Sequence, residues 1–206
     1  MEKLMIVNGS PRAPRSNSKR YGALVREAWG PGTETYLVTE KKHEEACRKL
    51  ASFDHLLFAF PLYADGLPIT LMGFLKALEK TPPAKKPTVH ILVNCGFYEP
   101  EQNRTACGMI QLFCRRNGYP LGSVLCVGSG EAILDTPFAS LVKRKIGKLV
   151  SSIKKGEPIS LKVTMPLPKR VYIRASTRYW LKYGEKNHLT RAQMETMDIE
   201  TPNNHY

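Results

Sequence analysis

The chain has 206 residues, a length that suits one domain with a sizeable core and is short for two. Hydrophobic residues make up 42% of it, and no apolar run reaches the roughly 18 residues that span a bilayer, which argues against a membrane-embedded protein. The net charge of +13 favours an anionic partner, although solubility alone explains such a charge equally well. The N-terminus enters a strand-like run without the pattern of a signal peptide, so we expect a cytoplasmic protein.

The cysteines indicate a reducing compartment. Their odd number and mostly apolar surroundings argue against a disulfide framework. No two have C-x-x-C spacing, so the sequence predicts no metal or iron–sulfur centre, and none has the arginine that a phosphatase loop requires. The cysteines are Cys47, Cys95, Cys107, Cys114 and Cys126.

Short apolar runs alternate along the chain with amphipathic stretches of helical period. Strands are predicted over residues 3–8, 33–38, 55–60, 88–94 and 121–128. Helices are predicted over residues 19–29, 41–52, 69–80, 102–117 and 138–155. This strict alternation predicts an α/β three-layer sandwich with a five-stranded parallel sheet, for which the flavodoxin-like order 2-1-3-4-5 is the natural arrangement.

The alternation stops after the fifth helix, and we predict a domain over residues 1–157 followed by an extension over residues 158–206. Prolines make residues 158–168 resemble an extended linker, residues 169–184 have a helical pattern, and residues 201–206 are expected to be loose. Basic residues recur every fourth position in the predicted helix beside a row of aromatic residues. The sequence leaves three interpretations of that helix: it packs on its own domain, it docks on a partner subunit, or it attaches to anionic lipid or nucleic acid. The basic residues are Arg170, Arg174, Arg178, Lys182 and Lys186.

The loop after the first strand offers a phosphate site. In an open parallel sheet, ligands bind beyond the carboxyl ends of the strands, where the strand order reverses. Hydroxyls, backbone N–H groups and a helix N-terminus in this loop suit a phosphate, and Arg15 adds positive charge. The competing interpretation is a simple helix cap, which needs only one such residue. The candidate phosphate ligands are Ser10, Arg12, Ser16, Asn17 and Ser18.

The loops after the third and fourth strands offer a surface for a flat ring. Leu62 and Tyr63 lie in a loop that prolines hold rigid, and Gly96 would let the backbone approach a heterocycle. The competing interpretation is that these residues only stabilise the packing of their loops. Cys95 lacks an evident basic partner, which argues against a nucleophile. The candidate ring contacts are Pro61, Leu62, Tyr63, Asn94, Cys95, Gly96 and Phe97.

These three loops together resemble the NADPH-dependent FMN reductase-like flavoproteins of the flavodoxin superfamily. The matching stretches are residues 9–12 with 16–18, residues 61–63 with 67–68, and residues 94–97 with Glu99. The resemblance covers about the first 150 residues, and the extension also resembles a C-terminal segment of some oxidoreductases in this group. It implies FMN as cofactor, NAD(P)H as reductant, a homodimer, and the two sets of candidate residues as phosphate and ring ligands. The compact cysteine cluster of the iron–sulfur branch is missing here.

On this resemblance we expect an NAD(P)H-dependent oxidoreductase that passes electrons through FMN to a quinone, another flavin or a small electrophile. The cofactor carries out such chemistry, so no acid–base residue is expected to be essential. One alternative is a flavodoxin-type electron carrier without NAD(P)H turnover, although carriers of this type are usually acidic. The other is a basic nucleic-acid or membrane-surface protein on the same scaffold, and salt-sensitive binding without flavin would favour it.

Overall fold

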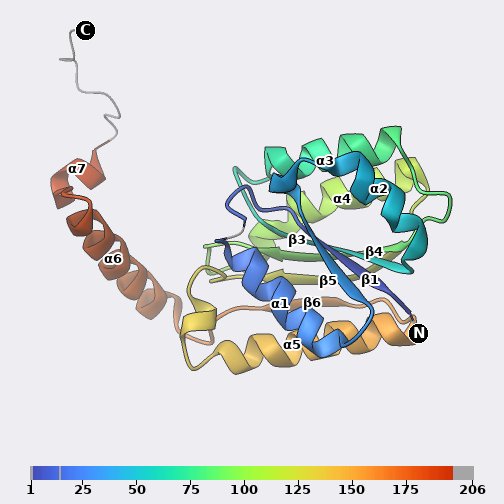
Figure 1. Ribbon diagram of the computed structural model, residues 1–206. Helices are drawn as coiled ribbons and strands as arrows, with labels where there is room; N and C mark the ends of the chain where they lie inside the picture. Colours follow the sequence, from blue (N-terminus) through green and yellow to red (C-terminus); the bar gives the residue numbers. More distant parts are fainter. Residues whose placement is uncertain (1, 14, 197–206) are drawn as a thin grey trace, which may run out of the picture. The chain divides into compact units, whose positions relative to one another are not determined.

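The protein is described here by a computed structural model that covers residues 2–13 and 15–196 (Figure 1). The predicted alternation of strands and helices is confirmed over the first 155 residues. The strands of this region are β1 (Leu4–Asn8), β2 (Thr33–Leu37), β3 (His55–Pro61), β4 (Thr88–Asn94) and β5 (Leu121–Val127). The α-helices are α1 (Asn17–Trp29), α2 (His43–Lys49), α3 (Ile69–Lys80), α4 (Arg104–Asn117) and α5 (Ala139–Lys155). Short 3-10 helices are η1 (Val38–Glu40), η2 (Leu50–Ser52), η3 (Pro100–Asn103) and η4 (Ile133–Asp135).

Together with a sixth strand, β6 (Ser160–Val163), the strands form one parallel sheet in the order β2-β1-β3-β4-β5-β6, which confirms the predicted order of the first five. Helices α1 and α5 cover one face of the sheet, and α2, α3 and α4 cover the other (Figure 1). Because all strands are parallel, their carboxyl ends meet at one edge. The loops after β1, β3 and β4 are therefore neighbours at the edge where a ligand is expected.

The predicted number of five strands is wrong, because the segment predicted as a linker contains β6 (Ser160–Val163). This strand pairs in parallel with β5, from Val124 beside Ser160 to Val127 beside Val163. It has four residues at the edge of the sheet, and only Val163 is buried. Residues 159–165 alternate between apolar and polar side chains, as expected of a strand, but the flanking prolines favoured the interpretation as a linker.

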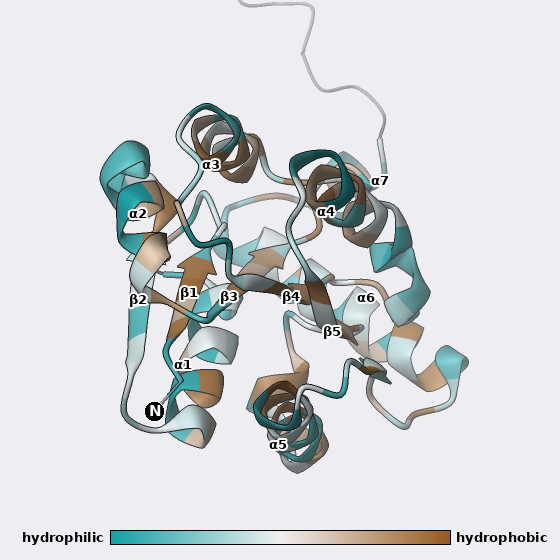
Figure 2. Ribbon diagram, turned by 90° about the vertical axis from the view of Figure 1, so that its right-hand side faces the viewer, coloured by the Kyte–Doolittle hydropathy of each residue, from teal (hydrophilic) through white to brown (hydrophobic). Residues whose placement is uncertain are grey.

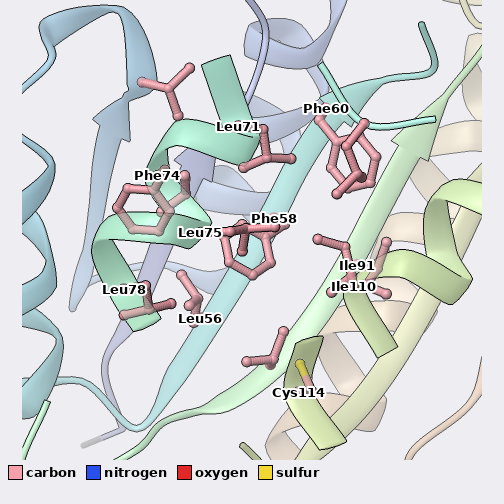
Figure 3. Packing of buried hydrophobic residues seen from close by; sticks show 14 of the residues in the cluster. Leu56, Phe58, Phe60, Leu71, Phe74, Leu75, Leu78, Ile91, Ile110 and Cys114 are labelled. Atoms are coloured by element: carbon pink, nitrogen blue, oxygen red, sulfur yellow. The ribbon is translucent and has the colours of Figure 1, made fainter. Parts of the chain in front are cut away.

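The larger core cluster fills the space between the sheet and helices α2, α3 and α4. Leu56, Phe58 and Phe60 point from β3 to this side, as expected from the alternation of side chains along a strand. Figure 3 shows them against Phe74 of α3 and Ile110 of α4. The hydrophobic sides of α3 and α4 face the sheet, and their hydrophilic sides face outward (Figure 2). This packing fixes the strand ends that support the candidate site.

The chain divides into two compact units after Met165, so β6 belongs to the first. In the second unit, α6 (Lys169–Lys186) contains the predicted helix and extends it to Lys186. The short α7 (Arg191–Glu195) packs against α6 at Gly184, where an added Cβ would lie 2.1 Å from Met194 Sδ. Residues 201–206, predicted to be loose, lie outside the described residues. None of the helices described is both long and apolar enough to cross a bilayer.

Candidate functional site

A hollow of about 390 Å³ opens at the carboxyl ends of β1, β3 and β4. It brings together all five predicted phosphate ligands and, from the predicted ring contacts, Pro61, Tyr63 and Asn94. Leu62, Cys95, Gly96 and Phe97 do not line it. The residues that line it are Ser10, Arg12, Arg15, Ser16, Asn17, Ser18, Arg20, Pro61, Tyr63, Asn94 and Glu131.

The loop between β1 and α1 is held in shape by its own side chains. The Ser10 N–H donates to Asn8 Oδ1 at 3.1 Å, and the Arg12 N–H donates to Ser10 Oγ at 3.2 Å. At the start of the loop, Gly9 lies so close to α3 that an added Cβ would be 2.9 Å from Leu71 Cδ2. This Cβ would also lie 3.0 Å from Phe60 Cβ, so the close packing directly after β1 favours glycine and fixes where the loop begins.

The start of α1 presents hydrogen-bond donors to the hollow. Ser16 is the N-cap, and its Oγ accepts from the Lys19 N–H at 3.2 Å, so the helix-cap interpretation holds for this residue. The backbone N–H groups of Asn17 and Ser18 donate to no group within the described part of the chain. A helix N-terminus with open N–H groups and a partial positive charge is suited to bind an anion. The exposed Arg12, which also lines the hollow, adds a full positive charge.

Asn94 links the end of β4 to α1. Its Nδ2 atom donates to Ser18 Oγ and to the Phe60 carbonyl oxygen, both at 3.0 Å. Asn94 and Ser18 are both buried. The two side chains thus connect β4, α1 and β3 at the floor of the hollow. The Ser18 hydroxyl accepts in this contact and can still donate its proton in a further hydrogen bond.

The predicted ring contacts are less closely gathered than the phosphate ligands. Tyr63 is 40% exposed and begins a tight turn that two backbone hydrogen bonds to Gly66 close. Phe97 is 51% exposed, and its carbonyl oxygen accepts from the Ser129 N–H. Leu62 packs against the core cluster instead of lining the hollow. Two aromatic side chains are therefore exposed at this end of the sheet, one on each of the two loops.

Cys95 lies below the loop after β4 and its thiol points into the protein. Its Sγ atom accepts from Asn103 Nδ2 at 3.3 Å and lies near the carbonyl oxygens of Phe97 and Val127. Burial raises the pKa of the Cys95 thiol to about 11. The thiol is thus protonated at neutral pH, which agrees with the expectation that Cys95 is no nucleophile.

Sequence reasoning missed the contribution of the segment after β5. Glu131 lines the hollow, and an added Cβ on Gly96 would lie 3.4 Å from Glu131 Cδ. Arg20 forms a two-pronged ion pair with Asp135, and the Arg20 guanidinium lowers the pKa of this carboxyl. No sequence signal could reveal contacts across more than 100 residues, because neither motif nor period connects them.

The described residues hold no group of three or more His, Cys, Asp or Glu side chains that could bind a metal ion. The chemistry available in the hollow is therefore that of hydroxyls, amides, open backbone N–H groups, guanidinium groups and one carboxylate. This donor set suits a phosphate-bearing ligand.

Neither a protein-family model nor a curated protein matches this sequence. Solved structures match in fold. An FMN-dependent NADH-azoreductase from Bacillus anthracis in complex with FMN has a TM-score of 0.56 and 10% identity over 74% of this chain and 99% of its own. An NADPH-quinone reductase from P. pentosaceus has a TM-score of 0.56 and 16% identity over 72% and 96%. A flavodoxin from Streptococcus pneumoniae TIGR4 has a TM-score of 0.55 and 14% identity over 74% and 99%. The flavodoxin-like fold is confirmed, and so is the resemblance in fold to FMN reductase-like proteins.

Proposed function

We propose that this protein binds FMN in the hollow and acts as an NAD(P)H-dependent oxidoreductase. The observation that carries the proposal is the start of α1, where the N–H groups of Asn17 and Ser18 are open and Arg12 lies beside them. This arrangement lies at the carboxyl ends of β1, β3 and β4, the position where flavodoxin-like sheets bind their ligands. Small electron acceptors such as a quinone, a flavin or an electrophile are the proposed substrates.

The donors in the hollow fit the phosphate of FMN. In the proposal, the N–H groups of Asn17 and Ser18 and the Ser10 hydroxyl bind phosphate oxygens, with Ser16 holding the first turn of α1 in place. Arg12 and Arg15 balance the phosphate charge. Because Arg20 is already paired with Asp135, it is proposed to position the segment after β5 and not to bind phosphate.

The loops after β3 and β4 are proposed to hold the ring. Pro61, Tyr63 and Asn94 would contact it from the hollow, while Gly96 and Phe97 would border it on the neighbouring loop. Leu62 and Cys95 would support these loops without touching the ring, because their side chains pack into the protein. FMN held there would supply the redox chemistry, namely hydride acceptance from NAD(P)H and electron transfer to the acceptor. The chain's own contribution is to orient the ring and exclude water.

We further propose a homodimer in the cytoplasm. Tyr179, Trp180 and Tyr183 are each about half exposed on α6, and their rings contact one another at centroid distances of 5.3 to 6.4 Å. A contiguous aromatic surface of this kind is typical of a protein interface. All five cysteines are free thiols, which suits a reducing compartment.

The test of the proposed function begins with the absorbance spectrum of the purified protein, in which flavin bands are expected. The flavin released by denaturation should run as FMN on chromatography, because no adenine-binding motif such as G-x-G-x-x-G is present in the sequence. NAD(P)H oxidation in the presence of a quinone should follow. Bound FMN without turnover would indicate an electron carrier, and failure to bind any flavin would refute the proposal.

A further inference from the structure

A second hollow, of about 440 Å³, lies between α4, β5 and β6, away from the candidate site. It exists because β6 extends the sheet by one strand on the side of α4. Its lining includes Cys107 of α4, Cys126 of β5 and Lys162 of β6, together with Glu101 and Arg104. None of these residues has a part in the proposed flavin site.

Two thiols meet in this hollow. Cys107 Sγ and Cys126 Sγ are 3.6 Å apart and share a hydrogen bond, although 19 residues separate them in the chain. A disulfide brings two sulfur atoms to about 2.05 Å, so each sulfur would move by less than about 1 Å to form one. Both side chains are largely buried, yet each lines the hollow, through which a small oxidant can reach them.

The charges around the pair favour a thiolate on Cys126. The hydrogen bond shared with Cys107 lowers the pKa of Cys126, burial raises it, and the positive charge of Lys162 lowers it. Lys162 is the register partner of Cys126 across the β5–β6 pair, so the two side chains stand next to each other on one face of the sheet. Glu101, which accepts from Lys162 Nζ at 3.1 Å, opposes this effect. The same hydrogen bond, together with burial, raises the pKa of Cys107.

We propose that Cys107 and Cys126 form a dithiol that hydroperoxides oxidise reversibly to a disulfide. With hydrogen peroxide, the Cys126 thiolate attacks one oxygen, so an S–O bond forms and the O–O bond breaks. The sulfur becomes a sulfenic acid, and the leaving oxygen takes up a proton to become water, or an alcohol where the hydroperoxide is organic. The Cys107 thiol then attacks this sulfur, the S–S bond forms, and the hydroxyl leaves with the Cys107 proton as a second water. Two thiols and one hydrogen peroxide thus give one disulfide and two waters, and a thiol reductant reverses the oxidation.

The test uses the reduced, full-length chain, treated with hydrogen peroxide, alkylated and digested with trypsin. The expected product is a cross-linked pair of peptides covering residues 105–115 and 117–143, which returns to separate peptides on reduction. The first peptide also contains Cys114, which does not line the hollow. The variant Cys114→Ser is therefore the matched control and should form the cross-link as the parent chain does, whereas Cys107→Ser should not form it.

The rate of cross-linking tests the assignment of Cys126 as the attacking thiol. Lys162→Met removes the neighbouring positive charge and should slow the reaction several-fold, because less of Cys126 is thiolate. Lys148→Met on the exposed side of α5 removes the same charge elsewhere and should leave the rate unchanged. The proposal is overturned if no cross-link forms in the parent chain and Cys114→Ser, or if the bond involves Cys114. Equal rates in the two lysine variants would overturn the role of Cys126.

Discussion

Replacing Arg12 by alanine tests the phosphate site without disturbing the loop that carries it. The Arg12 backbone N–H, and not its side chain, donates to Ser10 Oγ, so this hydrogen bond survives the substitution. The exposed side chain contributes a positive charge to the hollow and little to the core. A change in FMN binding would therefore report on the lost guanidinium and not on a collapsed loop.

The expected loss in FMN affinity is about ten-fold. A hydrogen bond to a charged group contributes roughly 1.5–3 kcal/mol, and each 1.4 kcal/mol corresponds to a factor of about ten. Because the Arg12 side chain is exposed to solvent, water screens its charge, and we expect the lower end of this range. Arg15→Ala should have a similar effect for the same reason.

The assay is a fluorescence titration of the apoprotein with FMN and, separately, with riboflavin, which lacks the phosphate. Arg12→Ala should weaken FMN binding and leave riboflavin binding unchanged. Arg26→Ala, in the last turn of α1 and outside the hollow, is the control for loss of the same charge. Equal losses for the two ligands, or an equal effect of Arg26→Ala, would refute the phosphate assignment.

Three further predictions concern the tail, the pH dependence and the packing. Deleting residues 166–206 should convert a dimer to a monomer and weaken flavin retention, measured by light scattering and by absorbance; a truncated chain that stays dimeric with its flavin would contradict this. Burial lowers the pKa of His90 to about 3, whereas the same imidazole in the unfolded chain takes up a proton below about pH 6.5. The free energy of unfolding should therefore fall by up to about 1.4 kcal/mol per pH unit as the pH drops from about 6 to 4. Urea unfolding of His90→Asn should lack this slope, and an equal slope would assign it elsewhere. Gly122→Ala should destabilise the protein by more than about 1 kcal/mol, because the new Cβ would lie 2.1 Å from the His90 ring, whereas Gly147→Ala in α5 meets no atom within 4 Å and should stabilise it by about 0.5–1 kcal/mol.

The fold followed from the sequence because its signals are local. The apolar run of β3 and the paired prolines after α3 mark one element each, and their alternation is sufficient to predict a parallel sheet. β6 was missed although Ile159, Leu161 and Val163 alternate with polar residues, because the strand is short and the flanking prolines favoured a linker. α7 was missed because five residues are too few for a helical period, and its only signal is the capping pair of Thr190 and Gln193.

The candidate site was predicted most completely in the loop that follows β1, whereas only Pro61, Tyr63 and Asn94 of the predicted ring contacts line the hollow. The hydroxyls and arginines of the loop after β1 adjoin one helix start, so they necessarily lie together. The direction of Cys95 depends on Asn103 and on the end of β5, which the sequence does not bring near it. The sequence did not predict Glu131 as a lining residue, because its backbone is held by Asn17 of α1, more than 100 residues earlier in the chain.

The contacts between α1 and the segment after β5 have a consequence for synthesis on the ribosome. Tyr21 donates from its hydroxyl to the Gly130 carbonyl oxygen at 2.7 Å, and Arg20 pairs with Asp135. The first turn of α1 is therefore made early but receives these supports only after residue 135 has left the exit tunnel. A nascent chain stalled before that point has synthesised the proposed phosphate-binding loop but lacks these two contacts. We therefore expect binding of the proposed ligand to begin late in translation, when most of the sheet has already emerged.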